Sequence, residues 1–139
     1  MKKIGVLLVF SLFFIGCKQK ISDADLAKIN GYWEIEKAEL PDGSKKEYTV
    51  NPTIDFIEIK GNKGFRKKVM PQMDGSYLMN NVSEKIEVTN TDGTVVLHYS
   101  TSYAKWKEEV LEVTNEHLVI RNDQDLEYTY KRPKPFSVK

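Results

Sequence analysis

Few side chains in this sequence could act chemically on a substrate. The two histidines, His98 and His117, have no further ligands at the spacing that a metal site of three or four ligands needs. Glu108 and Glu109 are adjacent, so in a strand their carboxylates face opposite sides and cannot work as an acid–base pair. The sequence has neither a serine in a strand–turn–helix setting nor a glycine-rich phosphate loop. We therefore expect no enzyme, no metal site and no cofactor.

The only cysteine, Cys17, follows a short apolar run that begins after Lys2 and Lys3. Residues 4–15 would span about 18 Å of helix, which is too short for a hydrocarbon core of about 30 Å. With Gly16 before the cysteine, this segment resembles the lipobox of bacterial lipoproteins. The resemblance implies that residues 1–16 are a signal peptide and that Cys17 carries acyl chains such as palmitate. Residues 17–25 would then form the lipidated start and tether, anchored stably in a membrane.

The residues after Cys17 indicate which membrane of the cell would hold the protein. In Gram-negative lipoproteins an Asp at the next position tends to retain the protein at the inner membrane, whereas this chain has Lys18. Lipoproteins that some Bacteroidetes export to the cell surface have acidic residues soon after the cysteine, and residues 18–20 have none. By resemblance, we expect an anchor in the outer membrane that faces the periplasm.

The charge balance excludes one class of partner. Cleavage before Cys17 would leave 123 residues (139 less the first 16), enough for one domain. These residues carry 19 basic side chains (21 less Lys2 and Lys3) and 20 acidic ones. A nucleic-acid ligand would need a basic face, so we expect no nucleic-acid partner.

The remaining sequence predicts one short helix followed by strands. Ser22 and Asp25 are typical of a helix start, and Asn30 and Gly31 of its end. Asp-Gly and Asn-rich turns then separate runs of β-branched and aromatic residues. The expected strands cover residues 33–40, 53–60, 65–70, 77–79, 82–89, 94–101, 106–114, 117–121 and 126–132. A meander of this kind either closes into a barrel or packs as two sheets.

Two motifs favour the barrel. Gly31-Tyr32-Trp33 follows the predicted helix, and Arg132 ends the last predicted strand. This arrangement resembles lipocalins, and the whole mature chain resembles lipocalin-like lipoproteins of the Bacteroidetes type. The resemblance implies a single antiparallel up-and-down barrel of about eight strands over residues 26–133, with residues 134–139 as a tail. It also implies that Gly31, Trp33 and Arg132 close one end of the barrel, the guanidinium packing across the indole. The family usually has a helix after the barrel, which Pro133 would block here.

Function is expected to depend on the inside of this barrel. Aromatic and methionine side chains in the middle of the chain could line a cup for a small hydrophobic ligand, or could simply fill a narrow barrel. An uninterrupted strand would turn Lys67 inward, where it could pair with a ligand carboxylate. A bulge in the basic run 66–68 would instead leave it in solvent. The candidate ligand-binding residues are Phe56, Lys67, Tyr77, Met79, Tyr99, Trp106 and Tyr128.

A filled barrel would indicate a different function. The chain would then be an interaction module that docks an envelope or secreted protein through loops at residues 41–46 and 71–74. A connected apolar cavity of about 300 Å³ or more would favour the ligand.

Overall fold

The structure, a computed structural model, describes residues 19–49 and 51–134 of the chain, so the predicted lipidation site at Cys17 lies outside the described residues. Helix α1 (Asp23–Leu26) continues into a 3-10 turn, η1 (Ala27–Ile29). The Ser22 hydroxyl accepts a hydrogen bond from the Asp25 backbone N–H, and the Asp25 carboxylate accepts one from the Ser22 N–H. These bonds, the largest cause being that from the Ser22 backbone, lower the pKa of Asp25 to about 2. The predicted helix start is therefore confirmed.

Ten strands follow, and they are antiparallel throughout. Their bounds are β1 (Gly31–Glu39), β2 (Lys45–Glu47), β3 (Ile54–Lys60), β4 (Lys63–Pro71), β5 (Tyr77–Met79), β6 (Glu84–Thr91), β7 (Thr94–Ser100), β8 (Lys105–Val113), β9 (His117–Asn122) and β10 (Glu127–Lys131).

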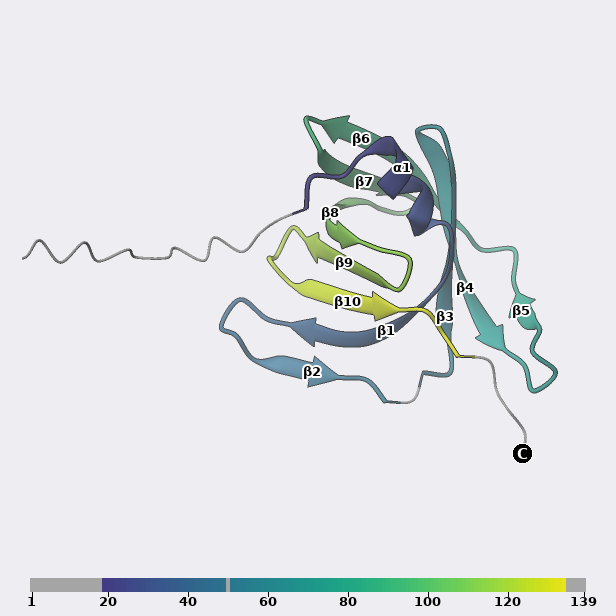
Figure 1. The fold of residues 1–139 in the computed structure, drawn as a ribbon. Coiled ribbons are helices and arrows are strands. Elements are labelled where there is room, and N and C mark those ends of the chain that lie inside the picture. Colours follow the sequence, from purple (N-terminus) through teal and green to yellow (C-terminus); the bar gives the residue numbers. More distant parts are fainter. Residues whose placement is uncertain (1–18, 50, 135–139) are drawn as a thin grey trace, which may run out of the picture.

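Eight of these strands form a closed ring, in the order β1, β3, β4, β6, β7, β8, β9 and β10. Pairing of β10 with β1 closes it, so the predicted antiparallel barrel is confirmed and the two-sheet alternative is wrong. The barrel is visible in Figure 1, where β10 and β1 lie side by side. The two short strands lie outside the ring, β2 on β1 and β5 on β4.

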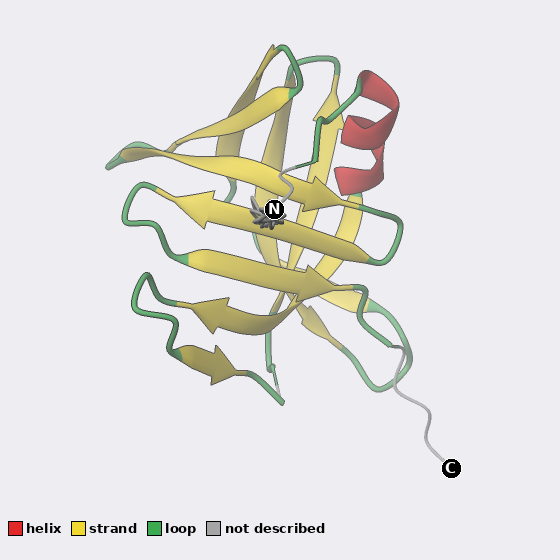
Figure 2. Ribbon diagram, turned by 60° about the vertical axis from the view of Figure 1, so that its left-hand side comes forward, coloured by secondary structure: helices red, strands yellow, loops and turns green. Residues whose placement is uncertain are grey.

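The up-and-down order places alternate turns at opposite ends of the barrel. We call the end that contains α1 and η1 the helix end; the β3–β4, β6–β7 and β8–β9 turns are also there. We call the opposite end the open end; it has the turns after β1, β4, β7 and β9. Ile21, Leu26 and Ile29 join the barrel core from the helix end, and Figure 2 shows the helix beside the strand ends there. Buried and less buried residues alternate along the core strands, as their apolar pattern requires, with Leu97 and Ile120 inside.

The N-terminal segment is fastened to the wall of the barrel. Strand β8 contains a bulge between Val110 and Glu112, and the Leu111 carbonyl there accepts a hydrogen bond of 3.0 Å from the Gln19 N–H. The Gln19 side chain in turn accepts one of 2.9 Å from the Val113 N–H. The Ile21 N–H donates to the Gly93 carbonyl in the β6–β7 turn.

No helix in the described parts of the chain is long and apolar enough to cross a membrane.

Candidate functional site

The helix end is closed by an arginine over a tryptophan. The Arg132 guanidinium carbon lies 3.6 Å from the centre of the buried Trp33 ring. The same guanidinium donates hydrogen bonds to the backbone carbonyls of Lys28 (2.7 Å), Tyr32 (3.1 Å) and Asn115 (3.0 Å). Three separate elements, η1, β1 and the β8–β9 turn, are therefore joined through one side chain.

Gly31 is required for this closure. Its φ of +116° is a conformation that side-chain-bearing residues rarely adopt, and a Cβ here would lie 2.9 Å from an Arg132 nitrogen. The Trp33 indole N–H donates to the Ile29 carbonyl at 2.7 Å, which holds the ring under the guanidinium. The structure thus brings Gly31, Trp33 and Arg132 together at one end of the barrel, where the guanidinium covers the indole.

The interior toward the open end contains a charged network around Arg66. Its guanidinium bonds to the Glu84 carboxylate at 2.6 and 3.0 Å and to the Glu108 carboxylate at 3.2 Å, and it lies 4.4 Å from the centre of the Tyr99 ring. Nearby, the Lys68 ammonium bonds to the buried Asp55 carboxylate at 2.9 Å. The charges that the barrel encloses are therefore paired within the protein.

Burial dominates the electrostatics of this network. It raises the pKa of Glu108, and Arg66 offsets part of the rise. Burial also raises the pKa of Tyr99 and of Tyr130, which keeps both hydroxyls protonated. For Arg66, burial acts to lower the pKa, but Tyr99 and the surrounding carboxylates outweigh it and raise the pKa above its ordinary value. At neutral pH the Arg66 guanidinium is therefore charged and the two tyrosine hydroxyls are neutral.

Side chains fill the barrel. Three of the predicted ligand-binding residues, Tyr99, Trp106 and Tyr128, are inside it, with the Tyr99 and Trp106 rings stacked 5.4 Å apart. The interior cavity lined by Tyr99, Arg66 and Trp33 measures about 10 Å³, room for about one water molecule. Within the described residues the barrel therefore has no interior cup of the size that a hydrophobic ligand needs, and the expectation that these residues line one is not met there.

The other predicted residues lie on the outside. Phe56 faces Lys67 across the β3–β4 register, whereas Ile57 and Arg66, the next pair along, point inward. The expectation that Lys67 points inward is therefore wrong. The pairing has no bulge at this point; the whole strand has the opposite phase, because Phe65 packs its ring against Phe56 on the outer face.

An aromatic cluster on the outer face explains why Phe56 and Phe65 point outward. The Tyr77 ring from β5 stacks on Tyr32 of β1 at 4.0 Å, and Tyr32 contacts Phe56 at 4.9 Å. Met79 pairs with Val69 on the same hairpin and is exposed. Phe56, Tyr77 and Met79 thus belong to the outer surface around β4 and β5 and do not line the interior.

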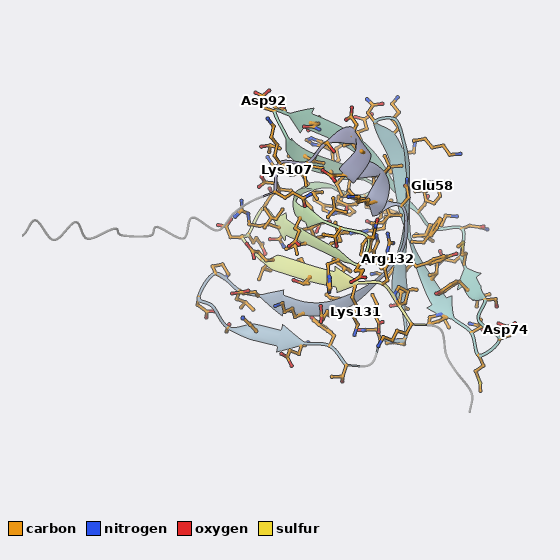
Figure 3. The ribbon with its side chains drawn as sticks, viewed as in Figure 1. Glu58, Asp74, Asp92, Lys107, Lys131 and Arg132 are labelled. Atoms are coloured by element: carbon orange, nitrogen blue, oxygen red, sulfur yellow. The ribbon has the colours of Figure 1, made fainter. Side chains whose placement is uncertain are left out.

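A groove lies next to this cluster. It is bounded by β1, the end of β10, the segment before β3 and the β4–β5 hairpin, and its volume is about 350 Å³. We call it the outer groove. Figure 3 labels Lys131, which lines the groove at the end of β10, and Asp74, in the turn of the hairpin whose residues Gln72, Gly75 and Ser76 line it. The residues that line it are Glu34, Thr49, Asn51, Ile54, Pro71, Gln72, Gly75, Ser76, Tyr77, Lys131, Pro133 and Lys134.

The open end carries the large apolar side chains that are exposed in the described structure. We call this set the apolar rim. Tyr103 in the β7–β8 turn is 98% exposed, and Met73 in the β4–β5 turn is 78% exposed. The full set is Leu40, Met70, Met73, Leu78, Met79, Val82 and Tyr103. The loops predicted to dock a protein, 41–46 and 71–74, are at this end.

A family model for the lipocalin-like domain matches residues 29–120, about two-thirds of the chain. The chain belongs to the lipocalin-like domain family. The match begins just before Gly31-Tyr32-Trp33 and stops in β9, so Arg132 lies beyond it. A lipocalin-like barrel suggests a role in binding or carrying a ligand, and the family is generally not enzymatic.

Two solved structures are similar to this lipocalin-like protein. One is a lipocalin-like protein from Bacteroides uniformis, with 8% sequence identity, a TM-score of 0.48, and coverage of 76% of this chain and 99% of the other. The second is an uncharacterized protein from Bacteroides eggerthii, with 13% identity, a TM-score of 0.46, and coverage of 75% and 98%. No functionally curated protein matches the chain in sequence.

The histidines of this lipocalin-like domain are occupied by ordinary contacts. The His98 ring lies 3.2 Å from the Thr89 hydroxyl, and His117 lies 3.9 Å from the Glu36 carboxylate. No group of three potential metal ligands occurs in the segments that the structure describes.

Sequence reasoning missed Arg66, Glu84 and Glu108 as a buried network, and it missed the outer groove. Arg66 belongs to the basic run 66–68, in which only Lys67 was assessed from the sequence, so its inward position was not predicted.

Proposed function

We propose that this protein is a membrane-anchored, lipocalin-like binding protein of the cell envelope, and that it binds a small, partly apolar molecule in the outer groove. The observation that supports the proposal is the contrast between the two spaces. The interior cavity measures about 10 Å³, whereas the outer groove measures about 350 Å³. The second value lies within the range of small-molecule sites, and the first does not.

The anchor is part of the same proposal. The lipobox resemblance around Cys17 supports acylation, and Lys18 supports the outer membrane. The lack of acidic residues at 18–20 supports its periplasmic face. Growth with an alkyne-tagged palmitate should label the protein, and Cys17→Ala should abolish the label and release the protein from the outer-membrane fraction. A labelled Cys17→Ala protein would contradict the proposed anchor.

Binding in the outer groove can be tested with a filling substitution. Thr49 lines the groove and is exposed, so Thr49→Trp should occupy the groove without disturbing the core. Small molecules extracted from natively purified protein would be identified by mass spectrometry. We expect a molecule that copurifies with the native protein and with Thr91→Trp, a matched change at the exposed end of β6, but not with Thr49→Trp. Equal recovery from both variants would place binding elsewhere.

A second function has its own support. The filled barrel and the apolar rim together favour docking of an envelope protein at the open end, because exposed apolar patches commonly mark interaction sites. A photo-crosslinking amino acid at Met73 should then capture one defined partner in cells, and one at Thr91 should not. Identical capture patterns from both positions would contradict docking at the rim.

A further inference from the structure

The outer groove combines an apolar floor with a basic edge. Ile54 is only 3% exposed and lies at its base, and the Tyr77 ring is fixed beside it by stacking on Tyr32. Pro71 adds a further apolar surface from the hairpin. These groups can cover a short hydrocarbon chain but offer little to a wholly polar molecule.

The charged groups lie along one side of this floor. Lys131 and Lys134 come from the C-terminal end of the barrel, and Glu34 comes from β1. The Glu34 carboxylate accepts a hydrogen bond of 3.0 Å from the Asn51 amide, which also bonds to the Ile35 carbonyl at 3.0 Å. Lys131 faces Glu34 across the β1–β10 register. This side of the groove therefore has two ammonium groups and one carboxylate, and that carboxylate already accepts a hydrogen bond.

We propose that the outer groove recognises a small amphipathic anion, whose carboxylate or phosphate head lies at Lys131 and Lys134 and whose hydrocarbon part lies over Ile54 and Tyr77. This inference rests on the proposed function and names the class of its ligand. Charge complementarity favours an anion, since a cation would meet the two lysines and a neutral amphiphile would leave them unused. The barrel interior cannot serve the same ligand, because Arg66 is neutralised there by Glu84 and Glu108.

Three ten-carbon probes with different heads test the inference. Decanoate, decyl phosphate and decanol would be titrated by calorimetry into the acylated full chain in lipid nanodiscs, with empty nanodiscs as background. We expect the two anions to bind about tenfold more tightly than decanol, as two partly exposed ion pairs would give. A preference between the anions would identify a carboxylate or a phosphate as the natural head.

The lysines are tested in the same assay. The double variant Lys131→Gln, Lys134→Gln should lose about tenfold in affinity for decanoate and keep its affinity for decanol. Retained decanol binding shows that the variant is folded. Lys67→Gln, which removes a lysine on the outer face that does not line the groove, should bind like the native protein.

The outcomes distinguish failure of the anionic-ligand proposal from failure of the proposed binding function. Equal affinity for decanol and decanoate, or an unchanged double variant, would overturn the proposal of an anionic ligand and leave a groove for neutral molecules. Binding of none of the probes would overturn the inference too, and copurification of a ligand that Thr49→Trp removes would then decide whether the groove binds at all.

Discussion

Replacing Arg132 by Ala should destabilise the barrel far more than an arginine-to-alanine change on its surface. The Arg132 side chain makes three hydrogen bonds of 2.7–3.1 Å to backbone carbonyls and stacks on Trp33. Each bond contributes about 0.5–1 kcal/mol here, because the guanidinium is only partly buried and water can replace it. The cation–π contact adds about 1 kcal/mol. The expected loss is therefore about 3 kcal/mol in the free energy of unfolding.

Urea denaturation of a chain without residues 1–16 and with Cys17→Ser measures this loss. The matched control is Arg121→Ala, which removes one partly exposed ion pair with Glu109 (2.9 Å) and should cost about 1 kcal/mol or less. In a Trp106→Phe background the emission of Trp33 should also move to longer wavelength when Arg132 is removed. A loss no greater than that of the control, with unchanged emission, would refute the role assigned to Arg132.

Three other predictions concern local features. Gly31→Ala should cost about 1–3 kcal/mol by thermal denaturation, because both its φ of +116° and the contact with Arg132 are unfavourable, whereas Gly43→Ala, at φ +86° in open space, should lose less. Ser22→Ala should cost about 1 kcal/mol in urea by removing the helix cap. Burial raises the pKa of Glu108 above 4.5, so its contribution to stability is complete below pH 4.5 and declines as pH rises through the folded pKa. The free energy of unfolding of Glu108→Gln should therefore fall less steeply than that of the native protein between pH 4.5 and neutrality, and parallel curves would contradict this.

The sequence was sufficient to predict the short helix and every strand except β2, which lies in a segment expected to be a loop. It left open whether the strands close into a barrel or pack as two sheets, and the resemblance to lipocalins favoured the barrel. In strands such as β7 and β9 the apolar residues occupy alternate positions, so Leu97 and Ile120 could be assigned to the inside. The closure by Trp33 and Arg132 was available only from the resemblance to lipocalins, because the two residues are far apart in the chain.

The phase of β3 and β4 could not be predicted in the same way. Strand β3 has apolar residues on both faces, Ile54 and Phe56 on one and Ile57 and Ile59 on the other, so alternation does not tell inside from outside. The outer face is covered by Tyr77 from β5, which pairs only with β4 and lies outside the ring. The phase therefore depends on tertiary packing, as does the outer groove, whose walls come from four separate segments.

The bonds between Gln19 and strand β8 set a limit on how this protein can stand on a bilayer. Position 17 is two residues from Gln19, which even a fully extended backbone spans in about 7 Å. If acyl chains are attached there, they lie within about 7 Å of the point where Gln19 bonds to β8, and the domain must rest against the lipid headgroups. The hairpin of β4 and β5, which Figure 1 shows on the side away from the N-terminal segment, would then point into the aqueous space. A ligand would reach its groove from solution and not from the lipid layer.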